Sequence, residues 1–195
     1  DDRIVGVEVD GERVPASGVV NAAGPWAPSV DAMAGVSLPL RHNVGPILVL
    51  DHDLDLALPF VEFEDGGYVR GEGEGRAFAG RYGVGYDAAE RLDPDAARST
   101  DESFRLAAGD RFERYLPGLA DARVATDWVG VRTLTPDGRP FVGETGVQGY
   151  YVATGMNGLG VTLAPAVGEH LASVVAPDRT PDGAFRELLS PARVE

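Results

Sequence analysis

Residues 128–166 read WVGVRTLTPDGRPFVGETGVQGYYVATGMNGLGVTLAPA, and this stretch decides the fold. An alternating strand pattern ends at Arg132, and the turn Thr135-Pro136-Asp137-Gly138 reverses the chain before a short apolar strand. A second strand at 150–154 leads directly into the glycine-rich loop 155–160, which a helix follows. This order predicts a place where the backbone comes close to a ligand.

The loop and the arginine both suit a negatively charged ligand. Glycine lets the backbone approach a ligand and adopt positive φ. The first N–H groups of the following helix have no partner within it, and the helix dipole favours negative charge there. Strand, glycine and helix also follow one another in many α/β proteins for packing alone. The glycine loop alone is thus a weak signal. Together with the nearby Arg132, whose rigid guanidinium fits a carboxylate, it predicts a pocket with two anion-binding walls.

These motifs together resemble the C-terminal part of the FAD-dependent amine and amino-acid oxidoreductases of the D-amino-acid oxidase type, such as glycine oxidase and sarcosine oxidase. The upstream run VVNAAGPWA, residues 19–27, is similar to a second motif of that family. The resemblance implies a mixed α+β fold in which an antiparallel-sheet substrate domain is inserted in a FAD-binding domain. It predicts that residues 1–37 and 122–195 belong to the FAD-binding domain and that residues 38–121 form the substrate-binding sheet with its helix.

The FAD-binding domain is expected to be incomplete. The family cradles the flavin's pyrophosphate in a GxGxxG turn between its first strand and helix, and no such unit is found here. The run GEGEG at 71–75 is glycine-rich, but its acids would repel a pyrophosphate. We therefore expect the C-terminal half of a longer protein, with the N-terminal Rossmann half as its missing partner. Alone, the chain should bind FAD poorly or not at all.

The resemblance also implies roles for particular residues. Arg132 matches the carboxylate-binding arginine of glycine oxidase, and Tyr68 matches a pocket tyrosine. His42 is a candidate to face the flavin, although a lone histidine or a sheet tyrosine is as often structural. Gly24 lies in a turn that approaches the cofactor in the family. The residues expected at the pyrimidine end of the flavin are Gly155, Met156, Asn157, Gly158, Leu159 and Gly160.

The implied reaction is oxidation of the C–N bond of a small amine or amino acid, such as glycine, sarcosine or a D-amino acid, by hydride transfer to FAD. Glycine oxidase has an arginine where this chain has Gly158, and sarcosine oxidase has a lysine where it has Thr162. These two departures leave the substrate open and make a dehydrogenase as credible as an oxidase. The alternative is a non-catalytic regulatory or scaffold subunit that kept the fold.

The amino-acid composition excludes several classes of partner and of binding site. The 195 residues carry 31 acids against 17 basic residues, all arginine, for a net charge of −14. Such a surface repels nucleic acid. The absence of cysteine removes disulfides and thiolate metal ligands, and no metal site is expected. With no run long enough to span a membrane, we expect a soluble, cytoplasmic protein. The acidic excess favours a halophilic protein, whose carboxylates remain solvated in high salt.

Local patterns predict the remaining elements. A hairpin is expected over residues 4–15, and the helix after residue 100 should be capped by Thr100. Its apolar stripe is expected to comprise Phe104, Ala108, Phe112 and Tyr115. The other expected elements are strands at 18–21, 38–50, 61–64, 68–70 and 76–82, a helix at 29–34 and a helical turn at 184–189.

Overall fold

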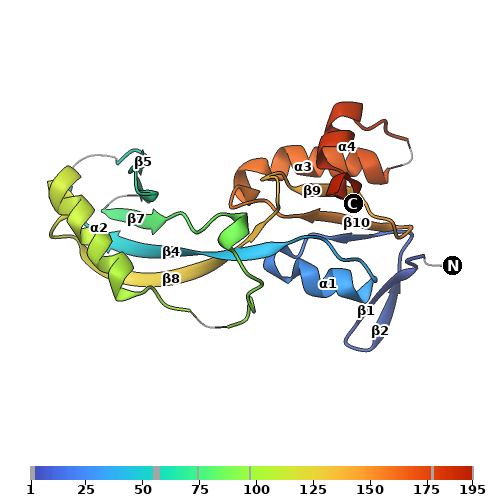
Figure 1. The fold of residues 1–195 in the computed structure, drawn as a ribbon, viewed down its shortest axis with the longest axis horizontal. Helices are drawn as coiled ribbons and strands as arrows, with labels where there is room; N and C mark the ends of the chain where they lie inside the picture. Colours follow the sequence, from blue (N-terminus) through green and yellow to red (C-terminus); the bar gives the residue numbers. More distant parts are fainter. Residues whose placement is uncertain (1–2, 55–57, 74, 97, 177, 195) are drawn as a thin grey trace. The chain divides into compact units, whose positions relative to one another are not determined.

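The computed structural model describes residues 3–54, 58–73, 75–96, 98–176 and 178–194. The chain forms two compact units. Unit 1 comprises Asp1–Asn43, Gly85–Pro94 and Arg132–Glu195, and unit 2 comprises Val44–Val84 and Asp95–Val131. Two long strands, β4 (Arg41–Asp51) and β8 (Arg123–Leu134), contribute residues to both units (Figure 1).

The boundaries between the compact units lie at 43/44 and 131/132, after those predicted at 37/38 and 121/122. Residues 85–94 also belong to unit 1. Both divisions fall inside long strands, β4 and β8. The sequence did not predict them, because the residue pattern of a strand does not change where the strand passes from one unit to the other. That unit 1 is a FAD-binding domain and unit 2 a substrate domain stays a prediction.

Unit 1 is built on a small mixed sheet. Its strands are β3 (Val19–Asn21), β9 (Phe141–Glu144) and β10 (Tyr150–Thr154), in the order β3-β10-β9. The central strand β10 pairs parallel with β3 and antiparallel with β9. The strand predicted at 150–154 and the turn before β9 are both confirmed, with Gly138 at φ 71° in that turn.

Helices cover this sheet on both sides. Neighbouring residues of β9 pack in different clusters, because successive side chains of a strand point to opposite faces. Phe141 packs with residues of β10 and of α1 (Ala27–Met33), whereas Val142 packs with residues of α3 (Gly160–Val175) and α4 (Gly183–Leu189). The helix predicted after the glycine loop is thus confirmed, as is the helical turn near residue 184.

The predicted N-terminal hairpin is confirmed as an antiparallel ribbon of β1 (Gly6–Val9) and β2 (Glu12–Pro15). Its turn residues Asp10 and Gly11 have φ values of 53° and 81°. Two consecutive positive φ values are what the tightest hairpin turns require, and Asp-Gly is one of the few pairs that accepts them.

Unit 2 is an antiparallel sheet covered by one helix. The strands are β5 (Val61–Glu62), β6 (Gly67–Gly71), β7 (Arg76–Arg81), β4 and β8, in the order β5-β6-β7-β4-β8. The three pairings from β5 to β4 are antiparallel, as predicted. One face packs against α2 (Glu102–Tyr115), whose buried apolar residues are Phe104, Ala108 and Phe112.

The predicted cap of α2 is wrong. Asp101 caps the helix, and its carboxylate accepts the N–H of Phe104 at 2.7 Å. Thr100 instead donates its hydroxyl to Asp127 at 2.6 Å, on β8. Both residue types cap helices well, so only the tertiary contact with β8 separates them. Tyr115 was also expected in the buried stripe, but it is 56% exposed.

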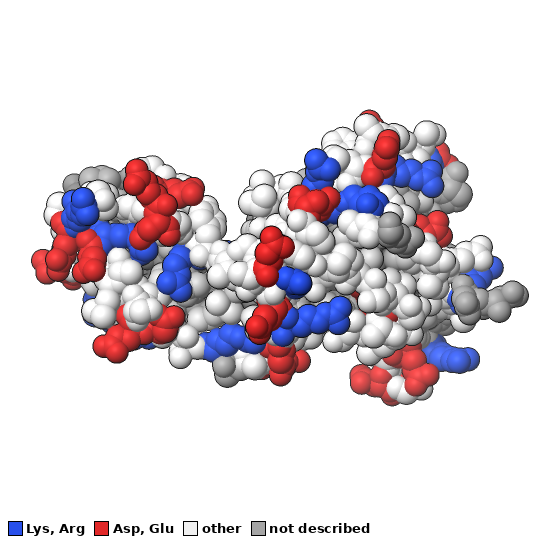
Figure 2. Space-filling model, viewed as in Figure 1, with Lys and Arg blue, Asp and Glu red and all other residues white. Residues whose placement is uncertain are grey.

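Short 3-10 turns complete the chain: η1 (Gly24–Trp26), η2 (Tyr86–Ala88), η3 (Pro117–Leu119) and η4 (Pro191–Val194). In the part of the chain that the structure describes, none of the helices has the length and apolar content that crossing a bilayer requires. Acidic and basic side chains lie close together in several groups on the face drawn in Figure 2, as the ion pairs between arginines and acids would lead one to expect.

Candidate functional site

Two turns meet at one edge of the unit 1 sheet. Because β3 and β10 are parallel neighbours, both have their carboxyl ends at the same edge. The turn Ala22-Ala23-Gly24 follows β3, and the glycine loop 155–160 follows β10 and leads into α3. In open α/β sheets this edge is the usual place for a ligand. The sequence predicted both turns as cofactor-binding, and the structure brings them to one edge.

Gly155 begins the loop in a position that only glycine fits. Its φ is +71°, and a Cβ atom there would overlap with Cγ2 of Thr135 and stand 3.3 Å from Cδ2 of Leu40. The loop therefore lies directly on the end of β8 and on the segment before β4. This packing holds the start of α3 close to β8.

Asn157 braces the loop against the end of β8. It has φ +52°, which asparagine tolerates better than most residues. Its N–H donates to the carbonyl of Thr133 at 3.0 Å. Its side-chain oxygen accepts the N–H of Thr135 at 3.1 Å, and its amide nitrogen donates to the carbonyl of Gly155 at 2.6 Å. The side chain that was expected to line the cofactor site thus makes the loop rigid.

Arg132 lies against the same loop. A Cβ atom on Gly158, which has φ +87°, would stand 3.2 Å from Cδ and 3.6 Å from Nε of Arg132. Glycine at 158 therefore gives the arginine side chain room to pass over the loop. The arginine and the loop, predicted from separate motifs, are neighbours in unit 1.

The start of α3 is open and carries no acid. Its N-cap, Leu159, makes no side-chain capping bond, and its first turn has no acidic residue. Leu159 is 56% exposed and Val161 94% exposed. Met156 lies beside Gly160: a Cβ atom built on Gly160 would stand 3.6 Å from the Cβ of Met156. A helix start with this surface favours an anionic or electron-rich group that also has an apolar part.

A buried polar cluster supports the other turn. Asp31 of α1 accepts hydrogen bonds at Oδ1 from Asn21 Nδ2 at 2.7 Å and from the Tyr150 hydroxyl at 2.9 Å. Asn21 also accepts the N–H of Ala23 at 3.1 Å and so shapes the turn itself. Next to Ala23, Gly24 has φ +56°, and among the described residues other than its two chain neighbours no atom lies within 4 Å of the place its Cβ would take. The hydrogen bonds of Asn21 thus fix the turn, and the space beside Gly24 is open.

Asp31 is 1% exposed, and its second oxygen, Oδ2, has no hydrogen-bond partner among the described residues. Burial raises the pKa of Asp31 above its ordinary value of 3.8, against the lowering effect of the hydrogen bonds from Asn21 and Tyr150. Folding therefore favours the protonated acid. The stability that this provides is present in acid and declines as the pH rises above the ordinary aspartate pKa.

Asp31→Asn is expected to raise the free energy of unfolding at pH 7–8 by about 1–2 kcal/mol, because a neutral amide keeps both accepted hydrogen bonds and removes a buried charge. The gain should shrink as the pH falls toward 4. Urea unfolding at several pH values measures it. Tyr150→Phe is the matched control: it keeps the carboxylate, removes one donor and should make the decline with pH steeper. A pH-independent difference between Asp31→Asn and the unchanged protein would show that Asp31 titrates normally.

His42 is buried in unit 1, where it holds the segment 85–94. Its backbone N–H donates to the carbonyl of Glu90 at 2.6 Å, and its Nδ1 atom lies 3.0 Å from the nitrogen of Leu92. These contacts join the start of β4 to the segment 85–94. A role for His42 toward a flavin stays a prediction.

Tyr68 belongs to unit 2, on β6. Its ring stacks on Phe60 with 5.5 Å between centroids and lies 5.4 Å from the ring of Tyr82. It also covers Gly80, where any side chain would overlap with the Tyr68 ring. Its predicted role in a substrate pocket is untested.

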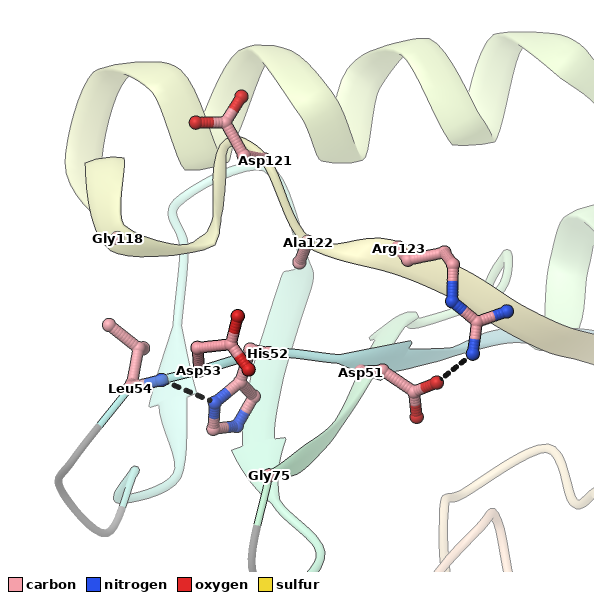
Figure 3. Close-up of a pocket in the computed structure, with 9 residues that line it drawn as sticks. All are labelled: Asp51, His52, Asp53, Leu54, Gly75, Gly118, Asp121, Ala122 and Arg123. Carbon is pink, nitrogen blue, oxygen red and sulfur yellow. Dashed lines mark hydrogen bonds and ion pairs between the residues drawn. The ribbon is translucent and has the colours of Figure 1, made fainter.

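A hollow in unit 2 gathers three aspartates and a histidine (Figure 3). Asp51 pairs with Arg123 and with Arg76, and His52 Nδ1 accepts the N–H of Leu54 at 3.2 Å. Across the described ranges, no group of three or more His, Cys, Asp or Glu side chains is arranged to hold a metal ion. We assign this hollow no role.

Sequence reasoning missed the residues that position the site. Thr135 was read only as the start of a turn, yet its methyl and hydroxyl both contact the glycine loop. Thr133 and Thr154, next to Arg132 and Gly155 in the chain, have buried hydroxyls for which the described part of the chain offers no partner. A threonine next to a predicted site residue is too common a pattern to have drawn attention.

Comparison with known proteins gives a consistent result. A model of the family described as "DAO: FAD dependent oxidoreductase" matches residues 1–174. The glycine oxidase of Pseudomonas aeruginosa is 28% identical over 176 residues, which are 90% of this chain and 46% of that protein. The chain spans about half the length of the curated relatives it matches.

Two solved structures share the fold over nearly all of the chain. L-proline dehydrogenase from P. horikoshii has a TM-score of 0.84 and 25% identity, and the match covers 100% of this chain and 51% of that one. Iminodiacetate oxidase from Chelativorans sp. BNC1 has a TM-score of 0.75 and 28% identity, with coverage of 93% and 48%.

Proposed function

The chain belongs to the DAO family of FAD-dependent oxidoreductases, and from this premise we propose that it is part of an enzyme that oxidises the C–N bond of a small amino acid or amine by hydride transfer to FAD. The observation that carries the proposal is the position of Arg132 against the glycine loop at the start of α3. A carboxylate-binding cation and an anion-stabilising helix start would then act on one bound pair of substrate and cofactor.

Arg132 is proposed to bind the substrate carboxylate. A guanidinium gives a carboxylate two parallel charge-assisted hydrogen bonds, which set both its position and its orientation. The proteins named above as relatives act, by their names, on glycine, proline and iminodiacetate, which all carry a carboxylate one carbon from the nitrogen. A fixed carboxylate places the neighbouring carbon, from which hydride must leave, at a constant distance from the loop.

The residues of the edge fit a flavin. When bound, FAD supplies the two-electron chemistry by accepting hydride from the substrate carbon next to nitrogen. The N–H groups at the start of α3 are proposed to stabilise the negative charge that accompanies this transfer. Gly24 leaves open space at its turn, and Met156, Gly158, Leu159 and Gly160 offer a surface with no acid that would repel an electron-rich ring.

Other parts of the proposal rest on the family. Unit 2, which contains most of residues 38–121, is proposed to be a substrate domain inserted in a FAD-binding domain, with Tyr68 in its pocket. His42 is proposed to face the flavin. Since no GxGxxG is found in this chain, the cradle for the pyrophosphate is proposed to come from polypeptide outside it. This chain alone should then bind FAD weakly.

The test is anaerobic reduction of the flavin in the full-length protein that contains this chain. Glycine, sarcosine and proline are each compared with the amine that lacks only the carboxylate: methylamine, dimethylamine and pyrrolidine. At least one amino acid should bleach the flavin absorbance about 100-fold faster than its matched amine, because two charge-assisted hydrogen bonds are lost with the carboxylate. Equal rates within every pair, or no bleaching at all, would refute the proposal. Reoxidation by oxygen or by an artificial acceptor then separates oxidase from dehydrogenase.

A further inference from the structure

In the part of the chain that the structure describes, only Asp10 and Asn157 combine a side chain with positive φ. Asn157 has φ 52°, a conformation that glycine adopts with less strain, as it does at Gly155 and Gly158 on either side. Backbone of this kind persists where the surrounding structure holds it. The contacts of Asn157 therefore show what keeps the glycine loop in its form.

The side chain of Asn157 makes its hydrogen bonds within the chain. Its Nδ2 atom donates to the carbonyl of Gly155 at 2.6 Å and to the hydroxyl of Thr135 at 3.2 Å, so both amide hydrogens are in use. Its Oδ1 atom accepts the N–H of Thr135 at 3.1 Å. Because a backbone N–H can only donate, this bond fixes which end of the amide is oxygen. Neither amide hydrogen is then available to a ligand.

These bonds tie the loop to the segment that carries Arg132. The backbone N–H of Asn157 also donates to the carbonyl of Thr133 at 3.0 Å. The loop is thus joined to the residues one and three places after Arg132 in the chain. The next loop residue, Gly158, faces the arginine side chain: a Cβ atom built there would stand 3.2 Å from Cδ of Arg132. A shift of the loop relative to the end of β8 would therefore change the space in which this side chain lies.

We propose that Asn157 is a positioning residue, which holds Arg132 at a fixed place relative to the start of α3 and so sets how well a substrate carboxylate is bound there. This inference rests on the proposed function, in which Arg132 binds that carboxylate. A guanidinium makes two parallel bonds to a carboxylate only when the two planar groups are aligned, so a small shift removes one of the bonds. Asn157 acts through Arg132 and makes no bond to the substrate.

Asn157→Gly in the full-length protein tests the proposal, because glycine keeps the positive φ and removes only the three side-chain bonds. Acetate is the probe, since it has a carboxylate and no C–N bond to oxidise. Ligand-observed NMR titration then gives a dissociation constant without turnover. Asn157→Gly is expected to weaken acetate binding about tenfold, the factor that one charge-assisted hydrogen bond provides. The ratio of flavin reduction rates between an amino acid and its matched amine should fall by the same factor.

The rate ratio in the Arg132→Ala background separates positioning from other roles. Without the guanidinium, Asn157→Gly should leave the ratio unchanged, because the two residues act as one unit. A residue that only stabilised the fold would lower both rates together and leave the ratio unchanged in either background. Asp10→Gly is the matched control: it removes the side chain of the other positive-φ residue, in the hairpin of β1 and β2, and should leave acetate binding and the ratio intact.

The proposal is overturned if Asn157→Gly keeps the acetate affinity and the rate ratio of the unchanged protein. It is also overturned if the ratio falls equally in both backgrounds, since Asn157 would then bind the carboxylate itself. If Asn157→Gly does not fold, Thr135→Val decides. This variant keeps the methyl and removes the hydroxyl that accepts from Asn157, so the ratio should fall about twofold to threefold, and an unchanged ratio overturns the proposal.

The same data separate this inference from the proposed function. A ratio well above one in the unchanged protein, with no response to Asn157→Gly, removes the inference and leaves the proposed function in place. A ratio of one in the unchanged protein removes both.

Discussion

Arg132→Ala in the full-length enzyme is expected to raise KM for its amino-acid substrate about 100-fold. The variant removes two charge-assisted hydrogen bonds to the carboxylate, together worth about 3 kcal/mol. If substrate and transition state are held equally well by this contact, kcat should change little, since uniform binding affects KM alone. Steady-state kinetics with a panel of amino acids measures both constants.

Three controls separate binding from folding. Arg132→Lys keeps the charge but not the fork and should recover only part of the affinity. Arg186→Ala removes an exposed arginine of α4 and should leave KM unchanged. For the matched amine without a carboxylate, Arg132→Ala should have almost no effect on the rate. An unchanged KM for the amino acid would remove Arg132 from the binding role.

Gly155→Ala is expected to lower the free energy of unfolding by about 2–5 kcal/mol. A residue with a Cβ atom at φ +71° is strained by about 1–2 kcal/mol. The overlap of its methyl with Cγ2 of Thr135 adds about 1–3 kcal/mol, because neither the loop nor the end of β8 can move freely. Chemical denaturation measures the loss.

A double-mutant cycle identifies the cause. Thr135→Ser removes the overlapping methyl and keeps the hydroxyl that accepts from Asn157, so it should restore about 1–3 kcal/mol in the Gly155→Ala background. Gly168→Ala is the matched control within α3, where the described residues, apart from the backbone of the helix itself, place no atom within 4 Å of the new Cβ. It should stabilise the protein by up to about 1 kcal/mol, as alanine does in a helix. Additive effects of the two substitutions at 155 and 135 would show that the contact between them carries no energy.

The sequence predicted much of the fold where local chemistry has one solution. Asp10-Gly11 accepts two positive φ values, so the hairpin around it was confirmed. The strand at 150–154, the glycine loop and α3 were predicted together, because apolar periodicity changes there from that of a strand to that of a helix. The family followed from the order of these motifs.

The cap of α2 and the roles within the loop needed the tertiary structure. Thr100 and Asp101 are equal candidates until Asp127 of the distant strand β8 takes one of them. That Asn157 binds the cofactor stays a prediction. The structure adds that its side chain holds the loop to Thr135, a contact across 22 residues of sequence.

What the sequence alone determined is thus which segments are strands, turns and helices, and which family they belong to, because those properties depend on neighbours along the chain. What only the tertiary structure decided is which side chains meet: Arg132 with Gly158, Thr135 with Gly155, and His170 with Phe185. The physical reason is that such contacts join residues far apart in the chain, and packing selects them from many partners that the local sequence allows equally.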